Sequence, residues 1–112
     1  MHRPVAVHVA IPDAGTVTSN ISVTRTGNAP TGLKVGVDIK HTYRGDLVID
    51  LIAPDGTTYR LRNSSGSDSA DNVITTYTVN ASTEAANGTW KLQVRDAYAA
   101  DTGYIDKWSL QF

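Results

Sequence analysis

Serine, histidine and aspartate, the three residue types of a hydrolase triad, all occur in this chain of 112 residues. Its histidines, His2, His8 and His41, lie in the N-terminal segment or at the start of a turn, and no G-x-S-x-G nucleophile motif is present. A triad is defined by the mutual geometry of its side chains, and these positions do not favour one. We therefore expect no catalytic residues and no enzyme activity of the chain by itself. The His41 ring is expected to hydrogen-bond to the backbone.

The tripeptide Arg44-Gly45-Asp46 has the letters of an integrin-binding motif and lies in the segment HTYRGDLVIDLIAPDGT, residues 41–57. We expect it to have a structural role. Gly45 is expected to permit a backbone angle that other residues resist, and Asp46 to accept backbone N–H bonds where a strand begins. Arg44 is expected to pair with a nearby carboxylate.

Hydrophobic residues recur with a period of two along most of the chain. The clearest case is 33–40, where Leu, Val and Ile at odd positions alternate with Lys, Gly and Asp, the pattern of a half-buried strand. An extended lead-in at 6–15 precedes predicted strands at 16–26, 33–40, 47–53, 58–62, 73–79, 89–95 and 104–112. No window keeps a helical period. The spacing of these short strands predicts an all-β antiparallel sandwich or jelly roll. Trp90 and Trp108 are expected in its core, with partners for their indole N–H groups.

Aspartates gather in three of the connections between these strands. If consecutive strands run antiparallel, the segments 41–46, 64–72 and 96–103 lie at the same end of the sandwich. That end collects Asp46, Asp68, Asp71, Asp96 and Asp101, whereas the opposite end carries only Asp55 and Glu84. Converging carboxylates repel one another unless they are neutralised, and Ca²⁺ is the cation suited to several oxygen ligands. The alternative is that these aspartates form turns and are solvated, with Arg44 or Arg95 pairing one or two of them.

Bulk composition excludes several classes of partner and site. The formal net charge of −1 gives no electrostatic basis for binding nucleic acid or an anionic membrane. No apolar run reaches the roughly 18 residues of a membrane-spanning helix. The chain has no cysteine, so disulfides, thiolate zinc sites and cysteine nucleophiles are excluded. We expect no nucleic-acid partner, no membrane partner and a monomer.

Five short motifs in a fixed order resemble a known family. They are HTYRGDL at 41–47, APDGT at 53–57, SADN at 69–72, NGTWKL at 87–92 with Asp96, and GYI at 103–105 with WSL at 108–110. Together they resemble the P domain, or Homo B domain, of proprotein convertases and of many secreted bacterial proteases, from about Ile11 to Phe112. The absence of cysteine and the Thr, Ser and Ala content are most similar to actinobacterial members.

The resemblance implies a jelly-roll sandwich of about eight strands that has no active site of its own. It implies a P domain at 11–112 after an N-terminal lead-in or linker at 1–10, and a secreted protein whose signal peptide lies outside this chain. The implied partner is a serine-type or metallopeptidase catalytic domain in the same polypeptide, on which the domain docks and which it stabilises. The alternative is a module that binds protein or polysaccharide substrate for a secreted hydrolase.

Overall fold

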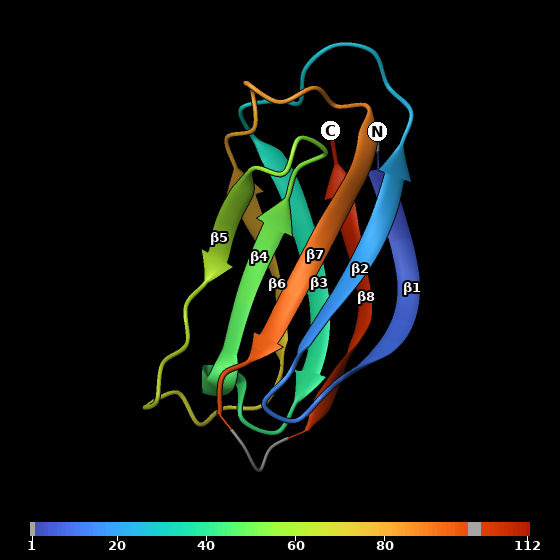
Figure 1. Ribbon diagram of the computed structural model, residues 1–112. Helices are drawn as coiled ribbons and strands as arrows, with labels where there is room; N and C mark the ends of the chain where they lie inside the picture. Colours follow the sequence, from blue (N-terminus) through green and yellow to red (C-terminus); the bar gives the residue numbers. More distant parts are fainter. Residues whose placement is uncertain (1, 99–101) are drawn as a thin grey trace.

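The computed structural model describes residues 2–98 and 102–112, and the side chains of residues 9–98 and 102–112. The described residues form eight strands in two four-stranded antiparallel sheets that pack face to face (Figure 1). In the first sheet the strand order is β1 (His2–Ile11), β8 (Gly103–Gln111), β3 (Leu33–His41) and β6 (Val73–Val79). In the second sheet the order is β2 (Thr16–Val23), β7 (Gly88–Asp96), β4 (Leu47–Ile52) and β5 (Thr58–Arg62). The predicted all-β sandwich is confirmed.

The N-terminal segment is part of the first sheet. Strand β1 begins at His2 and pairs antiparallel with β8 from His2 opposite Gln111 to Ile11 opposite Gly103, with an irregularity between Ala6 and Val9. Nine of the ten residues expected as a lead-in, 2–10, therefore lie in a paired strand. The division into 1–10 and 11–112 stays a prediction, and a truncation can test it.

The core follows from the period of two. Leu33, Val35, Val37 and Ile39 on β3 are all buried, as the alternation predicts. Trp90 and Trp108 are buried as well, and their indole N–H groups donate to the Ala86 carbonyl and to the Ser19 hydroxyl, each at 2.9 Å. Both tryptophans therefore have the hydrogen-bond partners that were expected of them.

Strand β4 is buried on both faces and is paired along both edges, with β7 and β5. Leu47, Ile49 and Leu51 belong to the core, and Val48 and Asp50 on the other face are buried as well. The Arg60 Nε on β5 donates to the Asp50 carboxylate at 2.5 Å, which neutralises this buried aspartate.

The connections gather at the two ends of the sandwich. A short 3-10 helix, η1 (Arg44–Asp46), the loop 63–72 and the connection after β7 lie at one end, at the bottom of Figure 1. The two chain termini lie at the other end. For the described residues, the predicted grouping of these three connections is confirmed. The described residues include no helix long and apolar enough to span a membrane.

Candidate functional site

The end of the sandwich around η1 holds most of the residues singled out from the sequence. We call it the loop end and define it as residues 41–47, 63–72, 96–98 and 102. Backbone hydrogen bonds join its segments: Gly45 N–H donates to the Asp68 carbonyl at 3.0 Å, and Ser65 N–H donates to the Gly45 carbonyl at 2.7 Å. Arg44 N–H donates to the Ala70 carbonyl at 2.9 Å. The loop 63–72 is thus fastened along η1 by main-chain bonds.

Gly45 is required by close packing and not by its backbone angle. The expectation of an unusual angle is wrong, because the φ of Gly45 is not positive, unlike those of Gly27, Gly56 and Gly88. A Cβ at position 45 would lie 2.1 Å from the Ser65 carbonyl oxygen and 2.5 Å from that of Asp68. Only a residue without a side chain allows the loop 63–72 to approach so closely.

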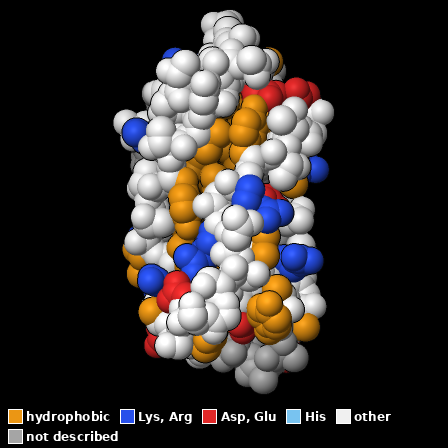
Figure 2. Space-filling model, turned by 90° about the vertical axis from the view of Figure 1, so that its left-hand side faces the viewer, with side chains coloured by type: hydrophobic (Ala, Val, Ile, Leu, Met, Phe, Trp, Pro, Cys, Tyr) orange, Lys and Arg blue, Asp and Glu red, His pale blue; other side chains and the backbone are white. Residues whose placement is uncertain are grey.

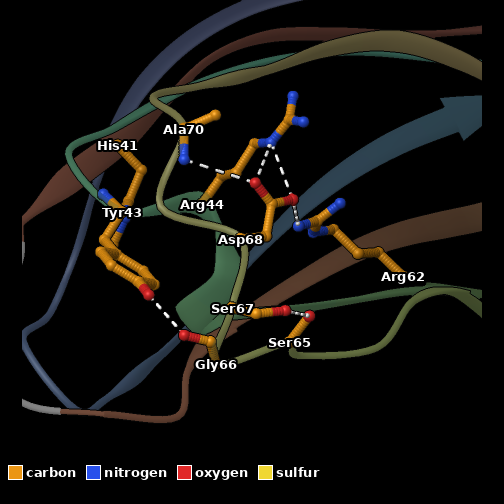
Figure 3. A network of polar contacts seen from close by, with 9 residues as sticks. All are labelled: His41, Tyr43, Arg44, Arg62, Ser65, Gly66, Ser67, Asp68 and Ala70. Carbon is orange, nitrogen blue, oxygen red and sulfur yellow. Dashed lines mark hydrogen bonds and ion pairs between the residues drawn. The ribbon is translucent and has the colours of Figure 1, made fainter.

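Asp68 lies between two arginines (Figure 3). The Arg44 Nε donates to both carboxylate oxygens, at 3.0 and 2.9 Å, and the Arg62 Nη2 donates to one of them at 2.8 Å. The Arg62 guanidinium first, and the Arg44 guanidinium second, hold the pKa of the Asp68 carboxyl below its usual value. The predicted pairing of Arg44 with a carboxylate is confirmed. Tyr43 adds a bond from its hydroxyl to the Gly66 carbonyl at 2.5 Å.

His41 and Asp96 form a pair beneath this network, and both side chains are fully buried. The His41 Nδ1 accepts a hydrogen bond from the Tyr43 N–H at 3.1 Å, which confirms the expected bond to backbone. Because Nδ1 is the acceptor, the hydrogen of a neutral ring lies on Nε2, which donates to the Asp96 carboxylate at 3.3 Å. The other Asp96 oxygen accepts the Tyr98 N–H at 3.2 Å. Both ring nitrogens of His41 therefore hold the loop end in place.

The five aspartates predicted to bind calcium have different surroundings. Asp68 is paired with two arginines and Asp96 with His41. Asp46 is buried, with 5% of its surface exposed, and Asp71 is exposed. Asp101 lies outside the described residues. Within the described part of the chain no three histidine, aspartate or glutamate side chains converge as a metal site would require. The four described aspartates of the set therefore do not form by themselves the six to eight oxygen ligands that Ca²⁺ takes, and the calcium site stays a prediction.

Two acidic residues outside the predicted calcium set, Asp55 and Glu84, lie at the opposite end of the sandwich. Glu84 is 4% exposed and accepts a hydrogen bond from the Tyr59 hydroxyl at 2.5 Å. This bond is the main cause that raises the pKa of Tyr59. A hydrogen bond with Glu84 is also the main cause that lowers the pKa of Asp55, whose carboxylate accepts the Thr57 N–H at 3.0 Å. One feature of the sequence could have indicated a specific role for Glu84: it is the only charged residue in the small, polar segment 80–88.

Comparison with known proteins decides the family. Residues 30–112 match the model of the proprotein convertase P-domain. The chain belongs to this family. The resemblance inferred from the five motifs is therefore confirmed.

The relatives of this P-domain are much longer proteins. It is 65% identical over 105 residues to the transglutaminase-activating metalloprotease of Streptomyces mobaraensis, and 59% identical over 107 residues to leupeptin-inactivating enzyme 1 of Streptomyces exfoliatus. Each match covers 93% of this chain but only 14% and 24% of the respective relative. The serine protease of Aeromonas sobria has the same fold, with a TM-score of 0.70 at 20% identity over 98% of this chain and 26% of its own.

Calcium appears in the name of a more distant relative. This is a calcium-dependent protease of Nostoc, 32% identical over 116 residues, of which the match covers 92% of this chain and 18% of the relative. The name describes the whole of that protein, and the described residues of this P-domain hold no matching cluster of ligands.

Proposed function

We propose that this P-domain is a non-catalytic accessory domain of a secreted protease. In this proposal it docks on the catalytic domain of the same polypeptide and stabilises it. The observation that carries the proposal is the coverage: a metalloprotease relative matches 93% of this chain at 65% identity, yet the match covers only 14% of that relative's length. The remaining length has room for a catalytic domain, in keeping with the name of the relative.

The chemistry of the loop end supports a structural role. The ring nitrogens of His41 and the carboxylates of Asp68 and Asp96 all bond to groups of the domain itself. Side chains whose polar atoms bond within the domain hold its loops in position. A general base or nucleophile must have access to substrate. The sandwich offers a rigid body against which a larger domain can pack.

The second candidate is a substrate-binding module, which one surface feature favours. A shallow groove of about 470 Å³ lies over Gly36 on the outer face of the first sheet, bordered by Thr76, Lys107 and Ser109. Gly36 has no side chain to fill this groove, and a Cβ at that position would lie 2.7 Å from the Ser109 hydroxyl oxygen. The groove is a place where an extended protein or polysaccharide chain could lie.

One experiment separates the two candidates. The protease that carries this domain is prepared with and without residues 1–112, and both forms are assayed for the rate of thermal inactivation and for adsorption to insoluble substrate. Faster inactivation with unchanged adsorption supports docking and stabilisation. Lost adsorption with an unchanged inactivation rate supports the substrate-binding module. If the form without residues 1–112 matches the complete enzyme in both assays, the result would contradict both candidate functions.

Calcium binding at the loop end is a separate proposal. The grouping of three aspartate-bearing connections supports it, and the ion pairs of Asp68 and Asp96 count against it. A ligand that binds only the folded chain stabilises it by mass action. Calcium binding therefore predicts that EDTA lowers the midpoint of thermal unfolding and that excess Ca²⁺ restores it. A midpoint that neither addition moves would exclude the site.

A further inference from the structure

Strand β6 is an edge strand without charged residues of its own, although Lys34 on the neighbouring β3 donates from its Nζ to the Thr78 hydroxyl at 2.9 Å. It is the last strand of the first sheet, pairs with β3 on one side, and has no neighbour on the other side among the described strands. Its seven residues, VITTYTV, include no charge, no proline and no glycine. Proteins usually guard such edges with charges, proline, bulges or short strands, because an unpaired backbone edge is a template for another strand.

The other sheet edges are better protected. Strand β5 has five residues, carries Arg60 and Arg62, and meets an irregularity between Ile49 and Asp50 of its neighbour. Strands β1 and β2 lie side by side at the opposite side of the sandwich, so each shields the other (Figure 1). Among the described residues, the side formed by β5 and β6 combines an edge strand without charged residues of its own with the exposed Ile74.

The surface around β6 is apolar. Ile74 has 63% of its surface exposed, the largest fraction of any exposed large hydrophobic residue in the described part. Tyr77 is only partly buried, and the groove over Gly36 runs beside the strand. Figure 2 shows hydrophobic side chains along this side of the molecule, interrupted by Lys and Arg.

We propose that the β6 edge binds the β6 edge of a second copy of this chain. The residues of β6 are β-branched except for Tyr77, so an antiparallel pair centred on Thr76 brings together side chains that suit one another. In this pair Thr76 faces its own copy, Thr75 faces Tyr77, Ile74 faces Thr78, and Val73 faces Val79. The pairs are Thr with Thr, β-branched with aromatic and β-branched with β-branched, which stabilise antiparallel strands, and no like charges meet. A two-fold axis through Thr76 makes the contact isologous and closed.

The contact area sets the strength of this association. A strand edge of seven residues buries far less than the standard interface of about 1,600 Å². The dimer is therefore weak, with a Kd on the order of 0.1–1 mM, and the dilute chain is the monomer expected from the sequence. Because the edge belongs to the domain itself, this association does not depend on the proposed role in a protease.

Sedimentation equilibrium of the 112-residue chain tests the proposal. The average mass is expected to rise toward that of a dimer as the concentration increases from about 0.01 to about 1 mM. Thr76→Lys places two like charges opposite each other at the two-fold axis and abolishes the rise. Ser22→Lys, at an exposed position of β2, is the matched control and leaves the rise unchanged. Urea unfolding of both variants confirms that they fold.

Disulfide trapping tests the register. The native chain has no cysteine, so Thr76→Cys introduces a single thiol. Directly opposed residues of antiparallel strands have Cα atoms about 4.5–5.5 Å apart, which suits a disulfide. Under mild oxidation Thr76→Cys is expected to form covalent dimers at least about ten times faster than Ser22→Cys. A native chain that stays monomeric at about 1 mM overturns the proposal, as does a dimer that persists in Thr76→Lys or equal trapping rates for the two cysteine variants.

Discussion

Each residue of the Arg44-Gly45-Asp46 triplet has an assigned place in the loop end. Arg44 pairs with Asp68, Gly45 leaves room for the carbonyls of Ser65 and Asp68, and the Asp46 carbonyl accepts the Ala97 N–H at 2.8 Å. Gly45 and Asp46 are both buried. A motif that binds a receptor must expose its residues, so this geometry favours a clamp for the loop 63–72 over an adhesion signal.

The packing around Gly45 gives a prediction with a control in the same loop. Gly45→Ala forces the carbonyl oxygens of Ser65 and Asp68 away from a methyl group, and we expect the free energy of unfolding in urea to fall by about 2–3 kcal/mol. Gly66→Ala meets nothing within 4 Å and should change it little. Equal effects of the two substitutions would show that the loop 63–72 does not press on position 45.

The arginines around Asp68 give a prediction for pH. Because the folded-state pKa of Asp68 lies below the unfolded value of about 3.9, its contribution to stability is complete above that value. The contribution is lost as the pH falls through the folded-state pKa. The difference in unfolding free energy between the native chain and Asp68→Asn should therefore be largest near pH 6 and shrink toward about pH 2. Urea titrations across this range measure it, and a difference that grows on acidification would refute the assignment.

At the scale of the strand, the period of two predicts most elements but not the polar residues inside them. The pattern predicted β3 and the buried face of β7 correctly, because apolar and polar residues alternate along both strands without exception. Ser19 lies on the buried face of β2 with Val17, Ile21 and Val23, and nothing in the pattern explains a polar residue there. Its reason is Trp108, a residue of the other sheet that lies 89 positions away in sequence.

Ser19 and Trp108 give a prediction for the contact between the sheets. Ser19→Ala leaves the indole N–H of Trp108 without its partner in a buried site, which should cost about 1–3 kcal/mol of unfolding free energy. Ser22→Ala, on the exposed face of the same strand, should be within about 0.5 kcal/mol of the native chain. Chemical denaturation followed by tryptophan fluorescence reports both. Equal losses for the two variants would mean that the hydroxyl of Ser19 is not needed.

The loops were harder to predict because their contacts depend on the path of the chain. Alternation of strand direction was enough to bring three connections to one end. It could not show that Asp68 meets Arg62 as well as Arg44, or that Glu84 is buried against Tyr59. Carboxylates at one end of a sandwich can point toward different partners, and here arginine and histidine side chains take Asp68 and Asp96.

At the scale of the whole molecule, the two termini lie together at the end opposite the clamp. A catalytic domain joined at either terminus would therefore meet the chain far from the Arg44 network. The arrangement separates the chain termini from the end whose loops are held by ion pairs. It also places β1 beside β8, where the first residues of the chain complete the first sheet.

The pairing of β1 with β8 gives a test of the domain boundary. If 1–10 is a linker, the chain 11–112 should be as stable as 1–112. If β1 is an integral strand, removal of residues 2–10 leaves most of one edge of β8 unpaired. This loss should lower the midpoint of thermal unfolding. A synthetic peptide of residues 1–11 should then restore part of the lost stability in a concentration-dependent way, because it binds only the folded chain. A scrambled peptide of the same composition is the control. The pairing predicts the second result, and equal midpoints for the two chains would assign residues 1–10 to a linker.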